Sequence, residues 1–88
     1  MKQINQSELK VDELYCDQPN LNCYDAVIMK YLGRIKGNHE FKYIAGFSEY
    51  IDNGDGIIRL AHYKKEPNYY WKVSTEKSGV IDEYLKNK

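Results

Sequence analysis

The sequence predicts a small α+β domain in which one capped helix packs on an antiparallel sheet. Three observations lead to this fold class. Residues 22–36 carry apolar side chains at helical spacing, residues 57–74 contain two segments rich in β-branched and aromatic residues, and residues 80–85 repeat a helical pattern behind the N-cap candidate Ser78. The 88 residues suffice for a single domain, and the polar residues 1–6 are expected to fray.

Residues 22–36 are predicted to form the central helix. Its apolar side chains follow the i, i+3, i+4, i+7 spacing of a single stripe and comprise Tyr24, Val27, Ile28, Tyr31, Leu32 and Ile35. Asn22 suits an N-cap, because its side-chain oxygen accepts a hydrogen bond from an otherwise unpaired N–H group. Asp25 places a carboxylate in the first turn, where the helix dipole favours it. Gly37 suits the position just beyond the last helical residue.

The sheet is predicted from the second half of the chain. Residues 57–64 and 69–74 are expected to be strands, because the first contains two Ile and a Tyr and the second contains two Tyr, a Trp and a Val. The four residues between them, Lys-Glu-Pro-Asn, are typical of a turn. The two strands are therefore predicted to form an antiparallel hairpin.

The remaining segments give weaker signals. Residues 7–15 fit neither period and are expected to form a short helix or an extended lead-in, and residues 16–21 are expected to form a loop. The aromatic residues of 41–47 favour a strand, whereas residues 48–51 fit both periods. The sequence DNGDG at 52–56 predicts a turn.

Composition and charge narrow the class of protein. Thirteen basic and thirteen acidic residues cancel, which argues against a nucleic-acid partner, because such binding depends on neutralising phosphates. The apolar runs are too short for a membrane span, so no membrane partner is expected. The first ten residues lack the apolar core of a signal peptide. The expected location is the cytoplasm, where Cys16 and Cys23 would remain thiols.

The sequence predicts no cofactor and no metal site. Cys16, Cys23, His39 and His62 could total four zinc ligands, but none of them stands at CxxC or HxxxH spacing. The DNGDG sequence at 52–56 superficially suggests a calcium loop, but it lacks the acidic residue at the third position and the closing Glu.

Cys23 is the sharpest candidate for chemistry. At the start of the predicted helix, its thiol would have a lowered pKa, because unpaired N–H groups stabilise the thiolate. His62, on a predicted strand, is the candidate general base, and Gln18 could donate its amide to an oxyanion. His39 would lie at the far end of the helix, out of reach. The alternative is that Cys23 is an inert packing residue and that each His is structural.

The stretch CDQPNLNCYDAVIMKYLG, residues 16–33, resembles the nucleophile region of papain-like cysteine peptidase folds. It is most similar to bacteriocin-processing peptidases and to the butirosin-biosynthesis acyltransferase-like domains of peptide-antibiotic gene clusters, where a Gln precedes a Cys that opens a long helix. The resemblance implies Cys23 as nucleophile, Gln18 as oxyanion-hole residue and His62 as general base, in natural product biosynthesis. The chain departs from the pattern in a shorter Gln-to-Cys interval, a much shorter Cys-to-His separation, and Tyr24 after the Cys.

Two functional hypotheses follow. The first is a small protein-interaction module of the inhibitor, immunity or adaptor type, which presents an aromatic surface formed by Tyr63, Tyr69, Tyr70 and Trp71. Such a module could be a non-catalytic relative of the cysteine peptidases. The alternative is thiol-dependent acyl transfer or peptide processing with Cys23 as nucleophile. The expected partner is another protein, or a peptide or carrier-protein substrate, and a homo-oligomer would help to stabilise so small a core.

Overall fold

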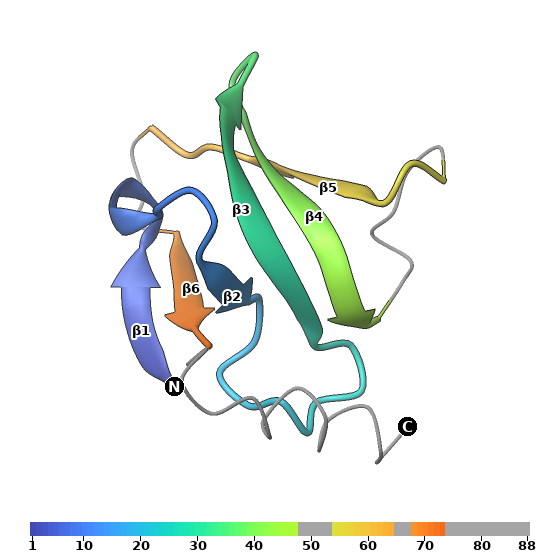
Figure 1. Cartoon of the computed structure of the whole chain (residues 1–88). Coiled ribbons are helices and arrows are strands. Elements are labelled where there is room, and N and C mark those ends of the chain that lie inside the picture. Colours follow the sequence, from blue (N-terminus) through green and yellow to red (C-terminus); the bar gives the residue numbers. More distant parts are fainter. Residues whose placement is uncertain (48–53, 65–67, 74–88) are drawn as a thin grey trace.

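The computed structural model describes residues 1–47, 54–64 and 68–73, and over these residues the chain is an antiparallel β domain (Figure 1). The elements in chain order are β1 (Lys2–Asn5), the 3-10 turn η1 (Gln6–Glu8), β2 (Leu14–Cys16), β3 (Val27–Ile35), β4 (Asn38–Gly46), β5 (Ile57–Ala61) and β6 (Tyr69–Lys72). They form one sheet in the order β1-β6-β2-β3-β4-β5, with every neighbouring pair antiparallel. The predicted α+β class is therefore wrong. None of the described segments forms a helix with the length and hydropathy that a bilayer crossing needs.

The predicted central helix, 22–36, is a loop followed by β3. Residues Val27–Met29 are fully buried although successive side chains of a strand point to opposite faces, so both faces of β3 are covered at this point. A strand buried on both faces shows a continuous apolar run, which also fits a helical stripe. Gly37 was predicted to stand just beyond the end of a helix, but it lies in the turn between β3 and β4. Lys36 and Gly37 have φ of 50° and 81°, the pair of positive values that a two-residue type I′ connection requires.

The predicted strands at 57–64 and 69–74 are present in part, as β5 and β6, but they do not form a hairpin with each other. β5 pairs with β4, whereas β6 lies between β1 and β2. Residues 1–6 do not fray, because Lys2–Asn5 pair with β6 and Ile4 is buried. The predicted C-terminal helix at 80–85 lies outside the described residues.

The sheet is curled, so that one face encloses the core. All six strands contribute to this core, whose members are Ile4, Tyr15, Val27, Met29, Tyr31, Phe41, Ile58 and Tyr70. The register of β3 with β4 shifts between Ile28 and Met29 and again between Tyr31 and Gly33. Such bulges bend a strand and increase its twist, which favours curling. The opposite face carries a second buried cluster of Leu14, Cys16, Ala26 and Val73, named the outer cluster below.

Gln6 joins the two ends of the curled sheet. It follows β1, one edge strand, and its side chain bonds to the backbone of Tyr63, which follows β5, the other edge strand. Gln6 Nε2 donates to the carbonyl oxygen of Tyr63, and Gln6 Oε1 accepts from the Tyr63 N–H at 3.1 Å. The Gln6 N–H also donates to the carbonyl of Asn68 at 2.7 Å. Figure 1 shows the segment after β5 running across β3 and β4 toward η1, which brings the two edges together.

Candidate functional site

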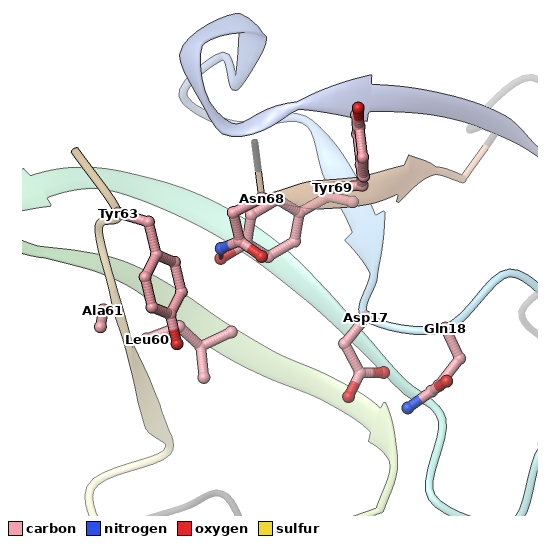
Figure 2. A pocket seen from close by; sticks show the side chains of 8 residues that line it. Asp17, Gln18, Leu60, Ala61, Tyr63, Asn68 and Tyr69 are labelled. Atoms are coloured by element: carbon pink, nitrogen blue, oxygen red, sulfur yellow. Dashed lines mark hydrogen bonds between the residues drawn. The ribbon is translucent and has the colours of Figure 1, made fainter. Parts of the chain in front are cut away.

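A cavity of about 230 Å³ lies where the two ends of the sheet meet, and it is named the tyrosine pocket below. Its lining comes from the end of β5, the start of β6 and the loop after β2, and comprises Leu60, Ala61, Tyr63, Asn68, Tyr69, Tyr70, Asp17 and Gln18. Figure 2 shows Tyr63 on one side of the pocket, Asp17 and Gln18 on the other, and Asn68 and Tyr69 between them. The loop after β2 is distant in the sequence from the other two segments, and β5 and β6 are not neighbours in the sheet, so the pocket depends on the curling of the sheet.

Three tyrosines form the aromatic walls of the pocket. Tyr63 is 53 % exposed and Tyr69 is 45 % exposed, whereas Tyr70 is only 2 % exposed and belongs to the core. The Tyr70 hydroxyl accepts a hydrogen bond from Asn68 Nδ2 at 3.3 Å. Burial raises the pKa of Tyr70 to about 12, against the opposing effect of the Asn68 hydrogen bond. The Tyr70 hydroxyl therefore stays neutral at physiological pH.

Asp17 is the one residue with a formal charge at neutral pH among the described residues that line the pocket. Asp17 Oδ1 accepts the Val27 N–H at 3.0 Å, which fixes the carboxylate at the start of β3. The neighbouring Gln18 donates through Nε2 to Asp25 Oδ2 at 3.3 Å. Both Asp17 and Gln18 are thus held by contacts within their own loop and the following strand.

The structure does not bring the predicted catalytic residues together. Cys23 lies in the loop before β3 and packs, partly exposed, against the outer cluster. His62 lies on the core side, where its Nδ1 is 2.9 Å from Nε2 of the buried His39. Gln18 lines the tyrosine pocket, which neither Cys23 nor His62 lines. No helix begins at Cys23, so the helix dipole on which the prediction depended is absent there.

The sequence did not predict the contact between His39, which is buried, and His62, which is partly exposed. His39 is 2 % exposed, and its Nδ1 lies 2.9 Å from the Tyr31 hydroxyl. Its Nε2 lies 2.9 Å from His62 Nδ1 and 3.3 Å from Gln6 Oε1. The backbone of Tyr63 fixes the orientation of the Gln6 amide, so Gln6 Oε1 must accept from His39 Nε2–H. His39 Nδ1 is then the acceptor of the Tyr31 hydroxyl.

One signal in the sequence could have revealed this pair. The DNGDG turn predicts a connection that reverses the chain, and it joins the segments that become β4 and β5. Antiparallel pairing around that turn places His39 opposite Leu60, two residues before His62. The predicted hairpin paired 57–64 with 69–74 and not with the segment that precedes the DNGDG turn. That pairing does not bring His62 close to His39.

The histidine pair makes stability depend on pH. Burial lowers the pKa of His39, and the positive charges of His62 and Arg34 lower it further. Unfolded His titrates near pH 6.5, so below about that pH the unfolded chain binds more protons than the folded one. The free energy of unfolding should therefore fall as the pH drops from about 7 to 5. Urea unfolding across this range should show a smaller fall for His39→Gln, and an identical fall in both proteins would contradict this role of His39.

The described residues hold no group of three or more His, Cys, Asp or Glu side chains placed to bind a metal ion. Cys16 and Cys23 are both free thiols. Burial raises the pKa of Cys16 to about 11, so this thiol is protonated and unreactive at neutral pH.

The described residues define a small antiparallel β domain with a tyrosine-walled pocket where its sheet closes. Comparisons with known protein families, with curated proteins and with solved structures find no match for this chain. The cysteine peptidase resemblance implied a long helix opened by Cys23, and the structure has a loop and a strand in its place.

Proposed function

We propose that this chain is a small protein-interaction module that holds one side chain of a partner protein in the tyrosine pocket. The observation that carries the proposal is the pocket itself, with two half-exposed tyrosines at its mouth, the buried Tyr70 as its wall and a carboxylate opposite Tyr63 (Figure 2). Tyrosine is enriched at protein interfaces, because it combines a large apolar ring with a hydroxyl that tolerates water.

The size of the pocket favours a single side chain as its occupant. Its volume is 230 Å³, whereas pockets for whole small-molecule ligands span about 300–1,000 Å³. A short exposed segment of a partner could lie across the mouth formed by Tyr63 and Tyr69 and place one residue inside. The zero net charge of the chain supports a protein partner over a nucleic acid.

The proposed surface differs from the one that the sequence predicted. Tyr63, Tyr69 and Tyr70 all line the pocket, but Trp71 points away from it and packs against the outer cluster. Successive residues of a strand face opposite sides, so Tyr70 and Trp71 of β6 lie on opposite faces of the sheet. We therefore assign binding to the three tyrosines and packing to Trp71. Two free thiols are consistent with a module that acts in the cytoplasm.

Selection of a displayed library of random dodecapeptides on the immobilised chain tests this function. We expect enriched peptides whose affinity falls by about tenfold for Tyr69→Ala, because truncating a central aromatic contact costs more than about 1 kcal/mol. Tyr24→Ala is the matched control, since Tyr24 is 83 % exposed and does not line the pocket. Failure to enrich any peptide, or equal binding of the enriched peptides to Tyr69→Ala, would contradict the proposal.

A further inference from the structure

We propose that the contact between His39 and His62 makes binding at the tyrosine pocket depend on pH, so that a partner held at neutral pH is released at about pH 5.5. The inference rests on the function proposed above and concerns its regulation. Two connections join the histidine pair to the pocket, one along the backbone and one through the Gln6 side chain.

The backbone connection runs through His62. This residue stands between Ala61 and Tyr63, which both line the pocket, so a shift of its backbone also moves that wall. The His62 N–H donates to the carbonyl oxygen of Gly37 at 3.3 Å, which ties the segment to the turn between β3 and β4. The His62 ring is partly exposed, so a proton can reach the pair from solvent.

The second connection is a single oxygen of Gln6. Gln6 Oε1 accepts from the Tyr63 N–H at 3.1 Å and lies 3.3 Å from His39 Nε2. The same oxygen therefore contacts the wall of the pocket and the buried ring. A reorientation of His39 would disturb the bond that fixes Tyr63 and, with it, the mouth of the pocket.

The neutral pair has room for one hydrogen between its rings. His39 Nε2 carries that hydrogen, because it donates to Gln6 Oε1, and His62 Nδ1 faces it with a lone pair from 2.9 Å away. A proton added to His62 Nδ1 would set two N–H groups against each other. Moving the His39 hydrogen to Nδ1 would relieve this conflict, but it would turn the Nε2 lone pair toward Gln6 Oε1.

His39 Nδ1 is the other position for an added proton, and it is also unfavourable. This atom accepts from the Tyr31 hydroxyl at 2.9 Å, so a proton there removes the acceptor. It would also place a charge on a ring that is only 2 % exposed. Each position thus breaks a contact of the closed form, in which Gln6 bonds to Tyr63. Proton uptake should therefore favour an open form in which the two rings have separated.

The titratable groups that the described strands place against the pair do not offset an added charge. Arg34 of β3 stands opposite His39 in the register with β4, and burial and the charges of His62 and Arg34 lower the pKa of His39. The rings of Tyr31 and Tyr70 lie 5.7 and 6.4 Å from that of His39, between centroids. Burial raises the pKa of both tyrosines, so neither supplies a negative charge below pH 7.

Two carboxylates on the elements that carry this network contact other groups. Glu40 follows His39 on β4 and so points to the opposite face, where it pairs with Arg59 Nε at 3.6 Å. Glu8 of η1 accepts from the Asn5 N–H at 3.5 Å. Among the described residues, the charge placed nearest the pair is therefore that of Arg34, which adds to the cost of protonation.

The affinity of a dodecapeptide at two pH values tests the proposal. The probe is a peptide enriched on the chain that needs Tyr69 and contains no His, Asp or Glu. Its affinity for the 88-residue chain should fall by about fivefold or more from about pH 7.5 to about pH 5.5, because the open form binds a proton near the usual His pKa of about 6.5. Circular dichroism at both pH values controls for global unfolding. Affinities equal within about twofold would overturn the proposal.

Two substitutions remove every imidazole, because the chain has two histidines. His62→Asn keeps an oxygen that can accept from His39 Nε2–H, and His39→Gln keeps an amide that can donate to Gln6 Oε1. In the double variant the ratio of the two affinities should fall to near unity, and an unchanged ratio would overturn the assignment to this pair. If the buried substitution prevents folding, His62→Asn alone gives the test, since it should at least halve the ratio.

Spectra of the free ¹⁵N-labelled chain separate this inference from the function on which it rests. The resonances of the Gln6 side-chain amide and the Tyr63 backbone should move between the two pH values in the original protein and stay fixed in the variant. A Tyr69-dependent peptide whose affinity ignores pH, or resonances that move alike in both proteins, would overturn the regulation and leave the binding function standing. A library that yields no peptide dependent on Tyr69 would overturn both.

Discussion

Replacing Phe41 by Ala is expected to lower the free energy of unfolding by about 3–5 kcal/mol, the usual cost of truncating a buried aromatic ring. Phe41 is fully buried, and its ring centroid lies 5.1 Å from that of Tyr31 and 5.4 Å from that of Tyr70. The substitution therefore leaves a cavity between β3, β4 and β6. Small domains have total stabilities of about 5–15 kcal/mol, so the variant would be close to unfolded.

Urea denaturation followed by circular dichroism measures this effect. Tyr24→Ala is a suitable control, because Tyr24 is also aromatic but is 83 % exposed and contacts the Phe47 ring only edge-on. The control should change the free energy of unfolding by no more than about 0.5–1 kcal/mol. Equal effects of the two substitutions would show that Phe41 does not occupy the centre of a core.

Gln6→Leu is the second substitution with a large expected effect, a loss of about 2–4 kcal/mol in the free energy of unfolding. Leucine has a similar size but cannot bond to the N–H and carbonyl of Tyr63 or accept from His39 Nε2. Polar groups in this partly buried network would lose their partners, and each such loss costs about 1–3 kcal/mol. The closure of the sheet would weaken, and with it the position of Tyr63 in the tyrosine pocket.

Gln3→Leu provides the matched control, because Gln3 lies on β1, the strand just before Gln6, and is exposed. It should change stability by no more than about 0.5 kcal/mol. Peptide binding is the second readout, since Gln6→Leu should reduce the affinity of Tyr69-dependent dodecapeptides while Gln3→Leu leaves it unchanged. A destabilised Gln6→Leu protein with unaltered peptide affinity would show that the Gln6 closure does not build the pocket.

Local signals in the sequence predicted some elements of the fold. The β-branched and aromatic residues of 57–64 and 69–74 indicated strands, and β5 and β6 lie within these ranges. The segment 41–47 was predicted to be a strand, and most of it belongs to β4. These predictions depend on residue type and on nearby turns, which are local properties.

The prediction of a helix at 22–36 was wrong because β3 is buried on both faces at its start. A strand buried in this way does not show the alternation of apolar and polar residues that marks a half-buried strand. Ile28 packs on the face opposite the main core, whereas Val27 and Met29 face that core, so three consecutive apolar residues are all buried. Such a run has no period of two, and its spacing with Tyr31 and later residues matches a helix. The preference of Val, Ile and Tyr for strands was the better guide in this segment.

The candidate site was predicted only in its aromatic part. Tyr63, Tyr69 and Tyr70 were expected to bind a partner, and they line one pocket. Tyr63 follows β5 and the other two lie on β6, and these two strands are not neighbours in the sheet. Asp17 was missed, because its position beside them depends on the order of strands and on the closure by Gln6. These are long-range contacts that neither composition nor spacing reveals.

A nuclear Overhauser spectrum of the ¹⁵N-labelled chain tests most directly the claim that a curled sheet, closed by Gln6, builds the pocket. The structure predicts cross-strand contacts between residues 27–35 and 38–46, and contacts from the side-chain amide protons of Gln6 to the backbone of Tyr63. Sequential amide–amide contacts running through 22–36, as in a helix, together with a Gln6 amide that shows no contact with Tyr63, would contradict it.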